Sequence, residues 1–242
     1  KINHVIAAVL GAWLLGASTA SMASKPDSIT DAELALLPRY CPDTMGFGYG
    51  DASYNTSPNA ARWVAIMGKG FWAVHHHCWA LIKMRRAERP GMRAVHKQGH
   101  WRSALADFQY VVDKSPSDFL LLPEIFTWIG RTEILLDHPA NAEEAFARVR
   151  AVKPDYWPAY FHWAEYLVAT GRKAEALAVI KTGLQHSPHA KPLLSLFTHL
   201  GGKPGEIPPP IVKQETAAPP ETPDVEANVQ PTPETQNENQ RP

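Results

Sequence analysis

Apolar residues recur three and four positions apart from about residue 67 to residue 200, with polar residues between them. This spacing is typical of one face of an α-helix and differs from the alternation of a half-buried strand. Gly171 and residues 138–141 interrupt the pattern where a chain reversal is expected, and Pro154 and Pro188 end it. The pattern therefore predicts an all-α protein built from short antiparallel helix pairs.

The segments that end at Pro154 and Pro188 can be aligned with each other at a period of 34 residues. In each, a large side chain is followed by a small residue where the paired helices cross, and the second helix carries an alanine and a large apolar residue. These positions are Phe126, Gly130, Ala142 and Phe146 in the first segment and Tyr160, Ala164, Ala176 and Ile180 in the second. The period and the pattern match the tetratricopeptide repeat (TPR), so two repeats are expected at about 118–153 and 155–188.

A third, interrupted repeat lies upstream of these two. Ala104, Phe108, Val111 and Pro116 repeat the spacing of a second helix, and the apolar stretch 71–86 supplies a first helix. Residues 89–99 separate the two as an insertion, and residues 193–200 predict a short helix that caps the stack. We expect a TPR-like helix-hairpin solenoid of about three repeats plus the capping helix over 67–200, preceded by an irregular N-terminal segment over 24–66.

The two ends of the chain have a different composition. Residues 1–23 carry Lys1 and His4, an apolar run over 5–17 and small residues over 18–23, which is the order of a secretory signal peptide. We expect cleavage after Ala23, or after Ala20, and a periplasmic or extracellular protein without a membrane span; an uncleaved anchor is the alternative. Residues 201–242 contain ten prolines and no aromatic residue, which predicts a disordered tail.

Two motifs lie at the start of the predicted helical region, LPRYC over 37–41 and HHHCWAL over 75–81. They resemble the paired LPxYC and HHxCWGL motifs of a bacterial family of exported TPR proteins, and the resemblance covers residues 31–195. Ala80 stands where that family usually has glycine. The family is functionally poorly described, so the resemblance implies export and a repeat fold without implying an activity.

Cys41 and Cys78 are the two cysteines of the chain, one in each motif. In an exported protein such a pair predicts a disulfide, which would tie the N-terminal segment to the first helix. A metal site formed by Cys41, Cys78 and His75 is an alternative, because only His75 and Cys78 share a helix face among residues 75–78. A reactive cysteine is a further alternative. It requires a thiolate, which neither cysteine can provide if the two form a disulfide.

The stretch 62–102 is strongly basic, with nine lysines and arginines against the single acid Glu88. Tryptophans 63, 72, 79 and 101 and Phe71 are interleaved with the cations, a composition that suits a surface for nucleic acid or another polyanion. An ordinary solvated face over a buried aromatic stripe is the alternative. The residues predicted to bind a polyanion are Arg85, Arg86, Arg89, Arg93, Lys97 and Arg102.

The repeats themselves predict a concave groove lined by their first helices, which could recognise a protein or peptide. The expected groove residues are Glu124, Thr127, Arg131, Phe161 and Glu165. The motifs of common hydrolases, nucleotide-binding proteins and metalloproteases are absent, so no catalytic residue and no cofactor is predicted. The first prediction is therefore a non-enzymatic binding scaffold, with self-assembly into a homo-oligomer or filament as a possibility. Polyanion binding is the second, and a metal or redox protein the third.

Overall fold

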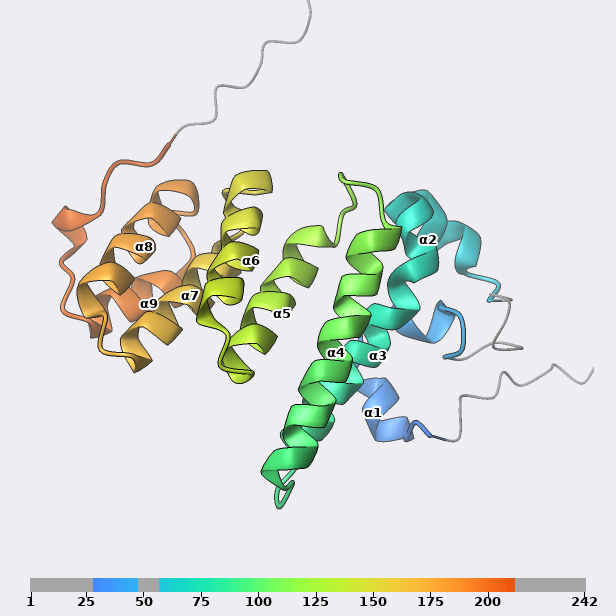
Figure 1. Cartoon of the computed structure of the whole chain (residues 1–242). Helices are drawn as coiled ribbons and strands as arrows, with labels where there is room; N and C mark the ends of the chain where they lie inside the picture. The colour runs from blue at the N-terminus through green and yellow to red at the C-terminus, as the bar shows by residue number, and fades with distance from the viewer. Residues whose placement is uncertain (1–27, 48–56, 212–242) are drawn as a thin grey trace, which may run out of the picture. The chain divides into compact units, whose positions relative to one another are not determined.

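The computed structural model describes residues 28–47 and 57–211, and its helices belong to the unit that ends at Pro210 (Figure 1). Among these residues there are no strands. The α-helices are α1 (Asp31–Ala35), α2 (Ala60–Met67), α3 (Val74–Ala87), α4 (Ala94–Lys114), α5 (Leu122–Leu135), α6 (Pro139–Val152), α7 (Trp157–Ala169), α8 (Lys173–His186) and α9 (Lys191–His199). Short 3-10 helices cover Cys41–Asp43, Gly68–Ala73 and Pro204–Glu206.

Helices α3 to α8 form three consecutive hairpins, α3 with α4, α5 with α6 and α7 with α8, and α9 packs against the last of them (Figure 1). Each hairpin also contacts the next through α4 and α5 and through α6 and α7. This arrangement is a TPR-like solenoid, so the predicted all-α fold, its two complete repeats and its capping helix are confirmed.

Local signals in the sequence set the ends of these helices. Proline occupies one of the first two positions of α5, α6, α7 and α9. A backbone N–H at these positions has no partner within the helix, so proline loses no hydrogen bond there. Gly171 makes the reversal between α7 and α8 with φ 77°, and Asp137 makes the equivalent turn before α6 with φ 65°. The turn expected over 138–141 thus lies earlier in the chain, because Pro139 already begins α6.

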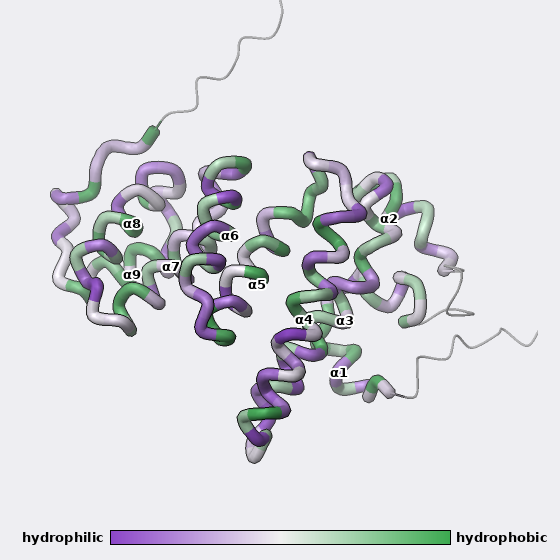
Figure 2. Tube along the Cα trace, viewed as in Figure 1, coloured by the Kyte–Doolittle hydropathy of each residue, from purple (hydrophilic) through white to green (hydrophobic). Residues whose placement is uncertain are grey.

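Buried apolar residues form two clusters along the solenoid. Figure 2 shows that hydrophobic and hydrophilic positions are interspersed along the helices that contain them. The first joins the N-terminal segment, α3, α4 and the start of α5; the second joins α6 to α9. Gly130 lets α5 approach α6 closely, since a Cβ at this position would lie 2.7 Å from the Phe146 ring. The small residue expected at the helix crossing is therefore required by the packing.

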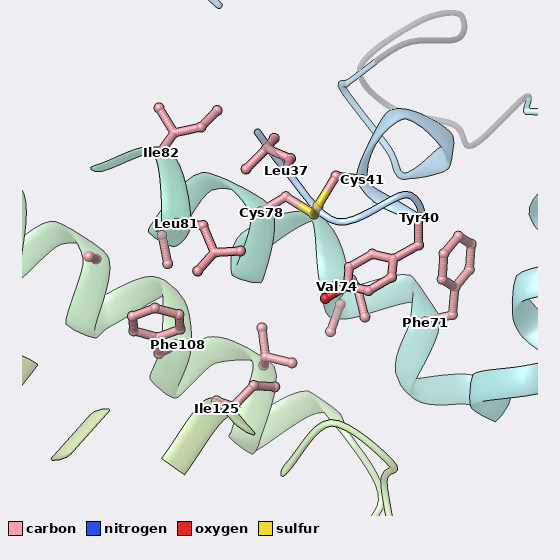
Figure 3. Packing of buried hydrophobic residues seen from close by; sticks show 14 of the residues in the cluster. Leu37, Tyr40, Cys41, Phe71, Val74, Cys78, Leu81, Ile82, Phe108 and Ile125 are labelled. Carbon is pink, nitrogen blue, oxygen red and sulfur yellow. A yellow bond between two sulfur atoms is a disulfide. The ribbon is translucent and has the colours of Figure 1, made fainter. Parts of the chain in front are cut away.

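The Cys41–Cys78 disulfide is formed, with a Cα–Cα distance of 5.8 Å. Both cysteines are fully buried, and Leu37, Tyr40 and Leu81 belong to the same cluster around the bond (Figure 3). The bond fastens the N-terminal segment to α3, as predicted. That segment is more regular than expected, because Thr30 and Glu33 form a capping box that starts α1, and α2 follows further along.

The insertion expected over 89–99 is largely helical. Helix α4 begins at Ala94 and runs for 21 residues, so only the short link before it separates the two helices of the first hairpin. The predicted signal peptide lies outside the described residues, as does the tail beyond residue 211. Within the described part of the chain, no helix is both long enough and apolar enough to cross a membrane.

Candidate functional site

A pocket of about 470 Å³ lies on the face of the solenoid formed by the first helices of the repeats. It is lined by residues at the end of α3, along the second half of α5 and along α7. These are Glu88, Arg131, Ile134, Leu135, Phe161, His162, Glu165, Tyr166 and Ala169. Because α5 and α7 also contact each other directly, the pocket bridges two repeats. We call it the α5–α7 groove.

The charged groups of the groove are arranged around Arg131. Its guanidinium lies over the Trp128 ring, 4.2 Å from the ring centroid, and burial lowers its pKa although Glu88 and Glu165 act in the opposite direction. His162 lies 2.9 Å from Glu165, yet burial and the charge of Arg131 lower the pKa of the imidazole. The groove thus combines an aromatic and aliphatic wall with a fixed cation and two carboxylates.

Three of the five groove residues expected from the sequence line this pocket, namely Arg131, Phe161 and Glu165. The other two do not. Thr127 is buried, and its hydroxyl donates to the Pro123 carbonyl oxygen at 2.8 Å. Glu124 faces α3, where its Oε1 lies 3.4 Å from Nε2 of His77. The first half of α5 packs against the preceding hairpin, so these two side chains lie away from the pocket.

The remaining lining residues were not predicted, although their spacing contains the signal. Ile134 and Leu135 follow Arg131 by three and four positions, and Tyr166 and Ala169 follow His162 by four and seven. Leu135, the last residue of α5, is 42% exposed. Ile134, Leu135 and Tyr166 thus lie one helical turn after residues that line the same pocket.

The residues predicted to bind a polyanion lie around the link between α3 and α4. They are not equally available for binding. Arg86 and Arg89 both contact Oε1 of Glu33 at 2.6 Å, and a side-chain nitrogen of Arg85 is buried without a hydrogen-bond partner. Arg93 at the N-cap of α4 and Lys97 and Arg102 on α4 have no carboxylate partner among the described residues. Burial and then the charges of Arg86, Arg89, His96 and Lys83 lower the pKa of His100, which shows that positive charge accumulates here.

The aromatic residues of this stretch mostly belong to the core. Phe71 is buried, and Trp63, Trp79 and Trp101 pack against the first apolar cluster. Trp79, for example, lies 4.8 Å from the ring centroid of Phe47. Trp72 is 50% exposed. The interleaved composition therefore reflects a buried aromatic stripe far more than a platform for stacking bases.

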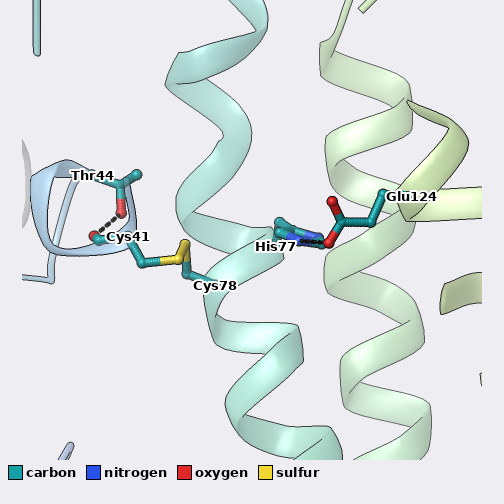
Figure 4. Close-up of a disulfide and its surroundings, with 5 residues drawn as sticks. All are labelled: Cys41, Thr44, His77, Cys78 and Glu124. Carbon is teal, nitrogen blue, oxygen red and sulfur yellow. Dashed lines mark hydrogen bonds and ion pairs between the residues drawn. A yellow bond between two sulfur atoms is a disulfide. The ribbon is translucent and has the colours of Figure 1, made fainter. Parts of the chain in front are cut away.

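The histidine and cysteine region does not form the metal site that the sequence allowed. Cys41 and Cys78 are bonded to each other, so neither is a thiolate ligand. Figure 4 shows His77 pointing from α3 towards Glu124 on the neighbouring helix, while Cys78 points in the opposite direction towards Cys41. The disulfide removes the proposed His75–Cys78–Cys41 ligand set and the reactive cysteine together.

Comparisons with known proteins add a partial similarity. No family model matches the chain, and no solved structure matches it. A stretch of 97 residues, 40% of the chain, is 28% identical to part of the Homo sapiens protein named protein O-mannosyl-transferase TMTC2. The matched stretch covers 11% of that protein, so the chain spans only a small part of its relative's length. The chain is similar to a segment of this protein and has the TPR-like helical repeat fold, which fits a role in protein interaction.

Proposed function

We propose that this protein is an exported, non-enzymatic scaffold that binds an extended segment of a partner protein in the α5–α7 groove. The observation that carries the proposal is a pocket of about 470 Å³ that joins two repeats and is lined by apolar and aromatic side chains around the Arg131 guanidinium. The proposed family is that of exported bacterial TPR proteins with paired LPxYC and HHxCWGL motifs, and the proposed location is the periplasm or the exterior of the cell. The confirmed disulfide supports an oxidising compartment.

The lining of the groove supports recognition of a peptide that offers both apolar and polar groups. Phe161, Tyr166 and Leu135 provide surface for an apolar side chain, and burying such a side chain contributes about 1.5–3 kcal/mol. Arg131 is held in place by Trp128 and can donate to a carbonyl or carboxylate oxygen. Glu165 is exposed at the rim and can accept from a backbone N–H or a cation.

Selection of peptides from a random displayed library against the purified protein tests the proposal. Affinity of the selected peptides is then measured for Phe161→Ala and Glu165→Lys. Glu175→Lys is a matched control, because Glu165 and Glu175 are both exposed acids that contact a basic side chain three residues earlier on a helix. We expect the two groove variants to weaken binding at least tenfold and the control to leave it unchanged. Equal affinity for all four proteins would contradict the groove assignment.

Polyanion binding by the α3–α4 hairpin is the second candidate. It is favoured by the three cations Arg93, Lys97 and Arg102, which have no carboxylate partner among the described residues, and by the positive charge around His100. Because the aromatic residues are mostly buried, the interaction would be electrostatic and would weaken steeply with salt.

Binding of labelled single-stranded nucleic acid over a salt series tests this second function. A variant with alanine at Arg93, Lys97 and Arg102 should lower the slope of log affinity against log salt by about 2. Alanine at Arg148 on α6, Arg172 in the turn before α8 and Lys191 on α9, all exposed cations, provides the charge-matched control. No binding by the native protein at low salt, or the same loss in both variants, would exclude a specific basic surface.

A further inference from the structure

The three consecutive histidines 75–77 have different environments. His77 is fully buried and faces Glu124, whereas His75 and His76 lie partly exposed on the first turn of α3. The ring centroids of His75 and His76 are 4.4 Å apart although the residues are adjacent in the helix. The Tyr110 ring of α4 lies 3.8 Å from the ring centroid of His76 and helps to fix its position.

The hydrogen bonds of these two rings determine which nitrogen is free. Nδ1 of His75 lies 3.0 Å from the Trp72 carbonyl oxygen, and Nδ1 of His76 lies 2.8 Å from Oδ1 of Asp107. A carbonyl and a carboxylate can only accept, so both Nδ1 atoms carry a proton. In the neutral rings Nε2 therefore has its lone pair available, and within the described part of the chain it has no hydrogen-bond partner in either residue.

The surroundings of the two rings favour this arrangement. Lys83 also bonds to Asp107 and so holds the carboxylate beside His76. An imidazole whose other nitrogen donates to a carboxylate or carbonyl is the usual form of a metal-binding histidine.

We propose that His75 and His76 form a surface site for a transition-metal ion, with Cu²⁺ as the preferred ion. Two imidazoles bound at right angles to one ion, each through a nitrogen ~2.1 Å away, have ring centres roughly 4.5 Å apart. The ring centroids of His75 and His76 are 4.4 Å apart, which matches this spacing. The site is independent of the α5–α7 groove and uses neither cysteine.

The number of protein ligands defines the class of site. Among residues 28–47 and 57–211, no group of three or more histidine, cysteine or acidic side chains is arranged to hold a metal ion. The histidine pair would thus supply two ligands and leave the other positions to water or to an exogenous donor. Imidazole nitrogens with open tetragonal positions favour Cu²⁺, which also binds a given nitrogen site more tightly than the other divalent ions of its row.

Titration of the purified protein with Cu²⁺, followed by calorimetry and electron paramagnetic resonance, tests the site. We expect one equivalent to bind with nitrogen hyperfine coupling from two imidazoles. His75→Ala/His76→Ala should remove this signal, and Asp107→Asn should weaken binding by about tenfold or more because it releases the orientation of His76. Zn²⁺ should compete weakly.

His189→Ala/His199→Ala is the matched control, since both histidines are exposed and lie outside α3. It should retain the site and its spectrum. His75→Gln/His76→Gln keeps polar side chains at the two positions and, with an unchanged melting temperature, separates loss of metal from loss of folding. The proposal is overturned if the native protein binds no Cu²⁺ at micromolar concentration, or if the double variant at 75 and 76 binds it as the native protein does.

Discussion

At the scale of single residues, Glu33 joins α1 to two arginines at the end of α3. Its carboxylate accepts from Nε of Arg86 at 2.6 Å, from Arg89 at 2.6 Å and from the backbone N–H of Thr30 at 3.0 Å. The residue is only 8% exposed. One acid on α1 therefore restrains two of the cations that the sequence made available for a polyanion, and it holds α1 against the end of α3.

The pH dependence of stability should report this contact. The hydrogen bond from Arg86 outweighs burial and, with Thr30, lowers the pKa of Glu33 from 4.5 to about 2. Because the folded pKa lies below the unfolded value, the stabilisation is complete above about pH 4.5 and is lost as the pH falls towards 2. We expect Glu33→Gln to be less stable than the native protein at pH 7, with a difference that shrinks between pH 4.5 and 2. Urea unfolding at several pH values measures this, and a difference independent of pH would contradict it.

At the scale of elements, the disulfide decides whether the N-terminal segment belongs to the fold. Cys41 and Cys78 are 37 residues apart, and both lie in the first apolar cluster. Closing a loop of this length lowers the entropy of the unfolded chain by the equivalent of about 4 kcal/mol. We expect Cys41→Ser/Cys78→Ser to lower the free energy of unfolding by roughly this amount, and a reductant to lower the melting temperature of the native protein but not of the variant. An unchanged melting temperature in the variant would show that packing alone holds the segment.

Close helix crossings are the second feature at this scale. A Cβ at Gly130 would lie 2.7 Å from the Phe146 ring, whereas nothing lies within 4 Å of the equivalent position at Gly99 in α4. Gly130→Ala should therefore destabilise the protein by about 1–3 kcal/mol through overpacking. Gly99→Ala should stabilise it by up to about 1 kcal/mol because alanine is the better helix former. Chemical denaturation of both variants checks the opposite signs, and two effects of the same sign would contradict the packing argument.

At the scale of the whole molecule, the two apolar clusters suggest that stability is divided along the solenoid. Residues of α3 and α4 contribute to the first cluster and residues of α7, α8 and α9 to the second, with α5 and α6 between them. In repeat proteins each unit contacts mainly its neighbours, so local opening can be confined to one end.

Amide hydrogen exchange of two core variants tests this division. Phe197→Ala removes a buried ring from the second cluster, and Phe108→Ala removes one from the first. We expect Phe197→Ala to accelerate exchange in α7 to α9 while α3 and α4 keep their protection, and Phe108→Ala to have the reverse effect. Uniform acceleration along the chain in both variants would indicate a single cooperative unit.

The sequence by itself determined the helical class, the repeats, the capping helix and the cysteine pairing. Each of these depends on local spacing or on composition: the period of 34 residues, proline at helix starts, and two cysteines in one chain. Such signals are set by neighbours within a turn or two of helix, so they can be read without a partner element.

Tertiary structure alone decided which of the candidate residues are exposed and free to contact a ligand or partner. Glu124 and Thr127 are spaced like groove residues, yet packing of α5 against the preceding hairpin takes them out of the groove. Arg86 and Arg89 look like free cations until the chain brings Glu33 beside them from more than 50 residues away. The His76 ring contacts Asp107 and Tyr110 of α4. Burial, charge pairing and side-chain orientation are set by contacts between distant segments, and no periodicity along the chain records them.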